Sequence, residues 1–142
     1  LCKLAESAMT QETWTDLWAR TPKNVYVWTI EHIFPEGENI PQSWVDMIAG
    51  GDMELAQKYL NEYTHKIGNL TITGYNSTLG NKSFLEKRDR QSKDGKRFIG
   101  YKNGLEINND IAQMDAWTID DIKRRSETLI QQLMEMFKFP SV

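Results

Sequence analysis

Two short β-rich segments, set among helical patterns, constrain the fold of this chain most. Residues 25–30 (VYVWTI) are β-branched and aromatic, and the strand that they predict ends before Pro35. Residues 70–73 (LTIT) predict a second, shorter strand that ends at Gly74. The other periodic segments are helical. The sequence therefore predicts an α+β fold, a helix-rich domain around a small β element.

Helical spacing of apolar residues predicts the elements that lie before the second strand. The first twenty residues have the spacing of a helix, which ends at Thr21-Pro22. Ser43 is a candidate cap for a short helix that continues to Ile48, and Asp52 is a candidate cap for a longer helix. The two helices between the strands are expected to form an inserted helical layer.

Further elements are expected after the second strand. Residues 76–87 predict a helix, although Gly80 makes it imperfect, and residues 91–109 predict a loop with at most one short strand. Thr118 and Asp121 have the spacing of a capping box and begin the most regular helix, at about residues 118–138. Its expected core face consists of Ile119, Ile122, Leu129, Ile130, Leu133 and Phe137.

Length and composition limit the class of protein. With 142 residues, 39% of them hydrophobic, the chain can bury one core, so residues 1–142 are expected to form a single domain. Cys2 is the only cysteine, which excludes a disulfide framework and a cysteine-based structural zinc site and suits the cytoplasm. No apolar run reaches the roughly 18 residues of a membrane span. Because the first residue is Leu1 rather than Met, we expect a processed chain or, as we prefer, a fragment of a larger protein.

Charge is distributed unevenly along the chain. The formal net charge is −3, yet residues 82–102 contain eight basic and three acidic side chains, which leaves −8 on the remainder. A solvated charged loop is the ordinary interpretation of such a stretch. A stripe that faces nucleic-acid phosphates is the alternative.

Only two histidines are present, so each is a distinct candidate for chemistry. His32 follows Glu31 at the end of the first predicted strand, and an isolated pair of this kind is most often structural. His65 lies at the end of the helix predicted after Asp52, where an interaction with the helix dipole is the ordinary interpretation. A contact with phosphate or with another site residue is the alternative for His65.

Three segments, taken in their order along the chain, resemble a known family. They are EHIFP at residues 31–35, GNLTI at 68–72 and NSTLGNK at 76–82. They resemble the HNH (ββα-metal) nucleases, and more closely the C-terminal HNH domain of modification-dependent type IV restriction enzymes. The resemblance continues in Phe84, Lys87, Trp117, Ile122 and Arg125, and so spans roughly residues 25–137. It implies a catalytic ββα-metal element at about residues 25–90.

The resemblance also implies roles for individual residues. His32 would be the general base that activates water, since an imidazole titrates near physiological pH. Asn69 would brace the loop that carries His32. Glu31 and Asn76 would supply oxygen ligands to one Mg²⁺ or Mn²⁺ ion. Asn81 is the alternative to Asn76, which we prefer because it lies nearer the predicted helix start.

The same resemblance implies a substrate and partners. DNA would be the substrate. The basic stretch of residues 82–102 supplies the candidate contacts to the DNA backbone, which are Lys82, Lys87, Arg88 and Arg90. A nucleotide-using, modification-sensing domain or subunit is expected elsewhere, because no Walker loop occurs in this chain. The expected role is restriction of modified foreign (phage) DNA.

Departures from the family pattern leave an alternative function open. Glu31 stands where many relatives have Asp, and Asn76 is a neutral amide, so the predicted ligand set is weak. The rival is a non-catalytic nucleic-acid-binding or protein-interaction module that keeps the fold. The tryptophans are expected to be core or interface anchors rather than base-stacking groups.

Overall fold

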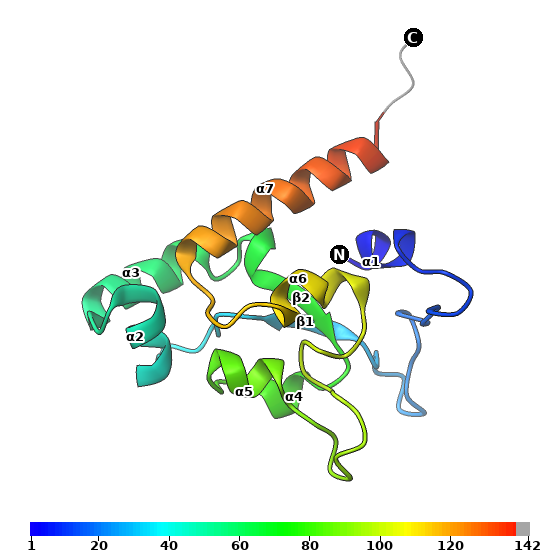
Figure 1. Ribbon diagram of the computed structural model, residues 1–142, viewed down its shortest axis with the longest axis horizontal. Helices are drawn as coiled ribbons and strands as arrows, with labels where there is room; N and C mark the ends of the chain where they lie inside the picture. Colours follow the sequence, from blue (N-terminus) through cyan, green and yellow to red (C-terminus); the bar gives the residue numbers. More distant parts are fainter. Residues whose placement is uncertain (139–142) are drawn as a thin grey trace.

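The computed structural model describes residues 1–138 as a mixed helical and β domain, which confirms the α+β prediction. Helices surround one small two-stranded sheet, with α2 and α3 on one side, α7 above and α4 and α5 below in Figure 1. The elements in chain order are α1 (Cys2–Ser7), β1 (Thr29–His32), α2 (Gln42–Ala49), α3 (Met53–Tyr63), η1 (Ile67–Asn69), β2 (Leu70–Thr73), α4 (Asn76–Leu79), α5 (Phe84–Arg88), η2 (Glu106–Asn108), α6 (Asn109–Ala112) and α7 (Ile119–Met136). No helix within residues 1–138 is long and apolar enough to cross a membrane.

The sheet is antiparallel, and its register fixes the first strand. Thr29 pairs with Thr73, and His32 pairs with Leu70. Strand β1 therefore begins later than predicted, since β2 ends at Thr73 and leaves residues 25–28 without a strand partner. Of these residues, Tyr26 forms only an isolated bridge with Arg20.

The helix predicted over the first twenty residues is mostly absent. Only α1 forms, and the segment that follows consists of turns and bends. Thr10 and Thr13 bond each other's backbone amides through their side-chain oxygens, which offers the chain an alternative to helical hydrogen bonds. The helix predicted over residues 76–87 is likewise divided into α4 and α5, because Gly80 ends α4 with a positive φ of 45°.

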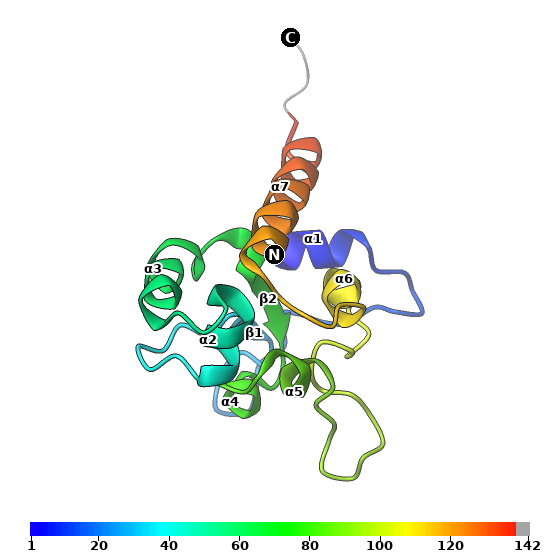
Figure 2. The same ribbon diagram turned by 60° about the vertical axis from the view of Figure 1, so that its left-hand side comes forward.

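The inserted helices and the last helix agree better with the sequence. Helix α3 begins at the Asp52 cap, whose carboxylate accepts a hydrogen bond from the Leu55 amide. Helix α7 begins with the expected capping box of Thr118 and Asp121. Its far end rises beyond the body of the domain in Figure 2. Ile130 and Phe137 are consequently exposed, against the prediction that they lie in the core.

The core joins the inserted helices to the end of β1. Phe34, Trp44, Phe84 and Trp117 form a chain of neighbouring rings, with Phe84 and Trp117 stacked at 5.9 Å between centroids. Phe34 is two residues beyond His32, so the segment that carries this histidine leads directly into the core. Trp14 and Trp18, by contrast, are exposed.

Close backbone packing attaches α7 to the turn before β2. A Cβ on Gly68 would lie only 2.1 Å from the Ile122 carbonyl oxygen, so only glycine fits there. The guanidinium of Arg125 donates to the Gly68 and Leu70 carbonyls at 2.8 and 2.7 Å. Helix α7 therefore holds the start of β2 in place.

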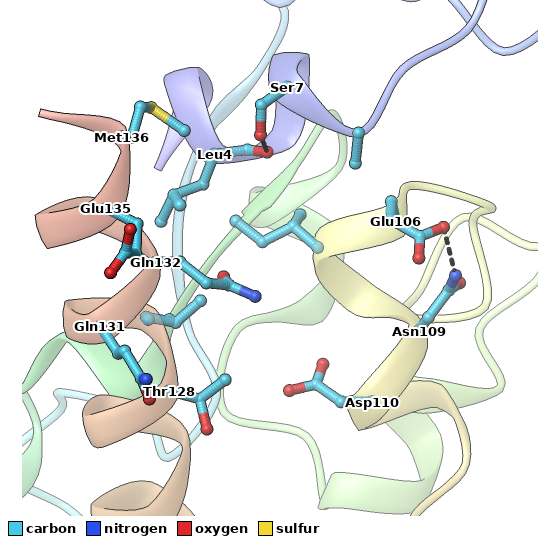
Figure 3. A pocket seen from close by; sticks show the side chains of 13 residues that line it. Leu4, Ser7, Glu106, Asn109, Asp110, Thr128, Gln131, Gln132, Glu135 and Met136 are labelled. Carbon is cyan, nitrogen blue, oxygen red and sulfur yellow. Dashed lines mark hydrogen bonds between the residues drawn. The ribbon is translucent and has the colours of Figure 1, made fainter.

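A hollow of about 720 Å³ separates the far end of α7 from α1 and the α6 region. Figure 3 shows its mixed lining, in which Leu4 faces polar residues such as Asp110 and Gln132. None of the residues that line it belongs to the site described next.

Candidate functional site

Strand alternation separates the two residues of the Glu-His pair. Side chains of neighbouring strand residues point to opposite faces. Glu31 is buried in the interior, whereas His32 is half-buried on the outer face, which it shares with the exposed Ile30. The pair therefore places a carboxylate inside the domain and an imidazole at its surface.

Asn69 braces the segment that follows His32. Its side-chain oxygen accepts from the Phe34 amide at 2.8 Å, and its amide group donates to the Phe34 carbonyl at 2.9 Å. The same amide group donates to the Thr64 carbonyl at 2.9 Å, and the Trp117 indole donates to the Asn69 oxygen at 3.2 Å. The side chain is fully buried, so these bonds fix the backbone on both sides of the site.

Lys87 holds the same segment from the interior. Its ammonium donates to the Glu31 carboxylate at 2.7 Å and to the carbonyls of His32 and Ile33 at 2.9 and 3.1 Å. Tyr101 adds a hydrogen bond from its hydroxyl to Glu31 at 3.3 Å. The buried Lys87 ammonium therefore donates two hydrogen bonds to the backbone at His32 and Ile33, and one to the Glu31 side chain, and so fixes the backbone that carries His32.

Burial shifts the pKa values of three ionisable groups at the site, Glu31, Lys87 and His32. It raises the pKa of Glu31 and lowers the pKa of Lys87, and their contact opposes both shifts. Burial also lowers the pKa of His32, and only the nearby Glu36 opposes this effect. His32 is therefore mainly neutral at pH 7, and a neutral imidazole has a nitrogen that can accept a proton.

His65 and Glu36 lie beside His32. The His32 Nε2 atom is 3.0 Å from His65 Nδ1, and the two rings meet edge to face. The Glu36 carboxylate is 3.7 Å from the same His32 nitrogen. Of the two interpretations of His65, the geometry favours contact with a site residue, because this side chain touches His32 directly.

The two candidate asparagines occupy different places. Asn76 begins α4 and donates from its amide group to the Ile30 carbonyl at 2.7 Å, which brings it to strand β1. Asn81 is exposed and lies against Gly37, in the loop after β1. Asn76 is thus hydrogen-bonded to the strand that ends at His32, whereas Asn81 lies beside the loop that contains Glu36.

Two of the four predicted DNA contacts do not fit their positions. Lys87 is buried and bonded to Glu31, so it cannot reach a phosphate. Arg88 is paired with Asp89 and Asp115, both at 2.7 Å. Lys82 is half-buried, and its carbonyl accepts from the Trp44 indole. Arg90 is exposed and stays a candidate.

Comparison with known proteins now identifies the relatives of this chain. The family model described as 'GmrSD restriction endonucleases, C-terminal domain' matches residues 2–132 of the chain. The chain belongs to this family. The resemblance to the C-terminal domain of type IV restriction enzymes is thereby confirmed. No curated protein and no solved structure shows significant similarity to the chain.

Membership of a family of endonucleases implies a divalent cation, and the predicted ligands do not fit one. Glu31, their only carboxylate, faces the Lys87 ammonium in the interior. Asn76 and Asn81 alone are neutral amides, which bind Mg²⁺ weakly.

Proposed function

We propose that this domain is an HNH-type endonuclease that hydrolyses DNA phosphodiester bonds, with His32 as the general base. One observation carries the proposal: a neutral, partly accessible imidazole stands on a backbone clamped by Asn69 and Lys87. A general base must be held in place as well as poised to accept a proton. A histidine of ordinary structural function needs no such support.

The neighbours of His32 stabilise its protonated form. When the Nε2 atom of His32 takes a proton from water, the new Nε2–H can donate a hydrogen bond to His65 Nδ1, 3.0 Å away. The Glu36 carboxylate, 3.7 Å from that nitrogen, favours the resulting positive charge. Asn69 acts as a positioning residue, because it bonds the Phe34 backbone rather than any reacting group.

DNA binding is proposed to involve the loop between α5 and α6, which extends away from the body of the domain in Figure 1. Arg90, Lys93 and Lys96 are exposed in this part of the chain. Arg97 donates to the Tyr75 hydroxyl at 2.6 Å, and Tyr75 directly precedes Asn76 at the start of α4. The basic loop is thus anchored beside the strand that carries His32.

Replacement of Arg90, Lys93 and Lys96 by Gln is expected to weaken DNA binding similarly for all sequences. Each lost phosphate contact reduces the magnitude of the salt slope of binding by about 0.9 on duplex DNA, so three lost contacts reduce it by up to about 2.7. Fluorescence anisotropy across a salt series measures the slope. The control replaces Lys3 on α1, Lys123 near the start of α7 and Lys138 just after the end of α7. Equal salt slopes in the two triple variants would mean that the loop between α5 and α6 does not contact DNA.

Cleavage of supercoiled plasmid DNA tests the proposed activity. Because a family of endonucleases implies a divalent cation, the chain is expected to nick the plasmid in Mg²⁺ or Mn²⁺ and to stop when EDTA removes the cation, although Glu31, Asn76 and Asn81 do not form a site for it. A chain that binds DNA with a steep salt dependence but never nicks it would favour the rival, a non-catalytic binding module. Absence of both properties would contradict a role on DNA.

The biological setting is part of the proposal. We propose that the domain acts in restriction of modified foreign (phage) DNA in the cytoplasm, and membership of a restriction-endonuclease family supports the restriction role. A separate nucleotide-using domain or subunit is proposed to sense the modification, since this chain has no Walker loop.

A further inference from the structure

Both histidines of the chain converge on one point of the surface. His32 ends β1 and His65 follows α3, 33 residues later, yet their facing nitrogens are 3.0 Å apart. Glu36 joins them from the loop after β1, and one donor atom from each of the three residues lies within 4.8 Å of the other two. Each of the three donor types, two imidazoles and a carboxylate, is an ordinary protein ligand for a metal ion.

The spacing of these atoms fits a single ion. A metal ion bound by two imidazoles at about 2.1 Å, with an angle between 90° and 110°, holds the two nitrogens about 3.0–3.4 Å apart. The observed nitrogen–nitrogen distance of 3.0 Å lies within this range. Glu36 is 61% exposed, so its carboxylate is free to close the remaining distance of 3.7 Å to the His32 nitrogen.

The histidines are held in this arrangement by the backbone. The Asn69 side chain bonds Phe34, two residues after His32, and also the carbonyl of Thr64, directly before His65. One buried amide therefore ties together the two segments that carry the imidazoles. A hollow of about 540 Å³, lined in part by Glu36, Glu38 and His65, opens beside them and gives an ion access from solvent.

We propose that His32, Glu36 and His65 form a binding site for a divalent transition-metal ion such as Zn²⁺ or Co²⁺. Two nitrogen ligands and one carboxylate select such ions over Mg²⁺, which prefers oxygen ligands. A nitrogen that coordinates a metal has no lone pair left for a proton. An ion at this site therefore withdraws His32 from general-base catalysis and inhibits cleavage, a consequence that rests on the proposed function.

Zinc binding can be followed by NMR, because the chain contains only two histidines and the signals of each ring can be followed separately. Titration of tag-free protein with Zn²⁺ alone is expected to shift both signals together and to saturate at one ion per chain. The Cys2→Ser background removes the only thiol. Glu36→Gln is expected to weaken binding by about tenfold or more. Glu38→Gln, which changes a carboxylate outside the cluster, is the control and should bind like the parent protein.

Inhibition is measured separately, in the plasmid assay with Mg²⁺ in excess. One equivalent of Zn²⁺ is expected to suppress nicking, and Glu36→Gln should need about tenfold more Zn²⁺ than the parent or Glu38→Gln for half-inhibition. A shift of only one histidine signal, or equal zinc affinity in both Gln variants, would overturn the site. Zinc binding without inhibition would overturn its link to His32. A chain that never nicks DNA but binds Zn²⁺ would refute the proposed function and leave the site intact.

Discussion

Replacement of His32 by Ala is expected to reduce DNA cleavage by about 10²–10⁴-fold, the usual contribution of a positioned general base. The fold should remain, because the His32 ring is half-buried and, among residues 1–138, its side chain makes only a hydrogen bond to His65 and a longer contact with the exposed Glu36. DNA affinity should remain as well, since the basic loop rather than this imidazole is proposed to hold the backbone. Single-turnover cleavage rates, circular dichroism and anisotropy measure the three quantities.

His65→Ala provides the matched control for this variant. It removes the other imidazole of the chain, at a similar position on the surface, but leaves the proposed base. We expect a much smaller loss of rate than in His32→Ala, because only the acceptor for the His32 proton is removed. Cleavage by His32→Ala within a few-fold of the parent rate would show that another group activates water.

Replacement of Lys87 by Met is expected to lower the free energy of unfolding by about 3–5 kcal/mol, the usual effect of removing one partner of a buried ion pair. Glu31 would then be left as an uncompensated charge, since its exposed fraction is only 2%. The carbonyls of His32 and Ile33 would lose their donor too. A loss of this size is a large part of the stability of a typical domain. Urea denaturation followed by tryptophan fluorescence measures it.

Two further variants separate the charge from the shape of the side chain. Lys58→Met makes the same chemical change at an exposed position of α3, and its effect should stay within about 0.5 kcal/mol. Adding Glu31→Gln to Lys87→Met removes the unpaired charge, so the double variant should be more stable than Lys87→Met alone. Equal stability of Lys87→Met and the parent would mean that the ion pair contributes nothing to folding.

The sequence located the candidate site better than it assigned the roles within it. Glu31 and His32 were placed in one site because they are adjacent in the motif, but adjacent strand residues face opposite ways. That alternation was a usable signal, and it was missed. Asn69 and Asn76 lie near β1, as the family motif implied, because short connections fix their positions relative to the strands.

Other features depended on contacts between distant segments. Nothing local marks Lys87 as buried, since its partner Glu31 is 56 residues away. His65 meets His32 only because Asn69 joins the two segments. Trp14, Leu17 and Trp18 have helical spacing, but most of this region lies outside the core, and the side chains of Thr10 and Thr13 compete for its amides.

The residues that hold the backbone around His32 lie far from it along the sequence, and this has a consequence during synthesis of the chain. Ribosomes release the N-terminal part first. His32 therefore emerges before Asn69 and Lys87, and well before Trp117 and Arg125, which hold Asn69 and the start of β2. A nascent chain has its proposed catalytic imidazole long before it has the backbone that aims it. We expect DNA cleavage to begin only after α7 has packed against the turn before β2. Incomplete chains would then contain His32 but would not cleave DNA.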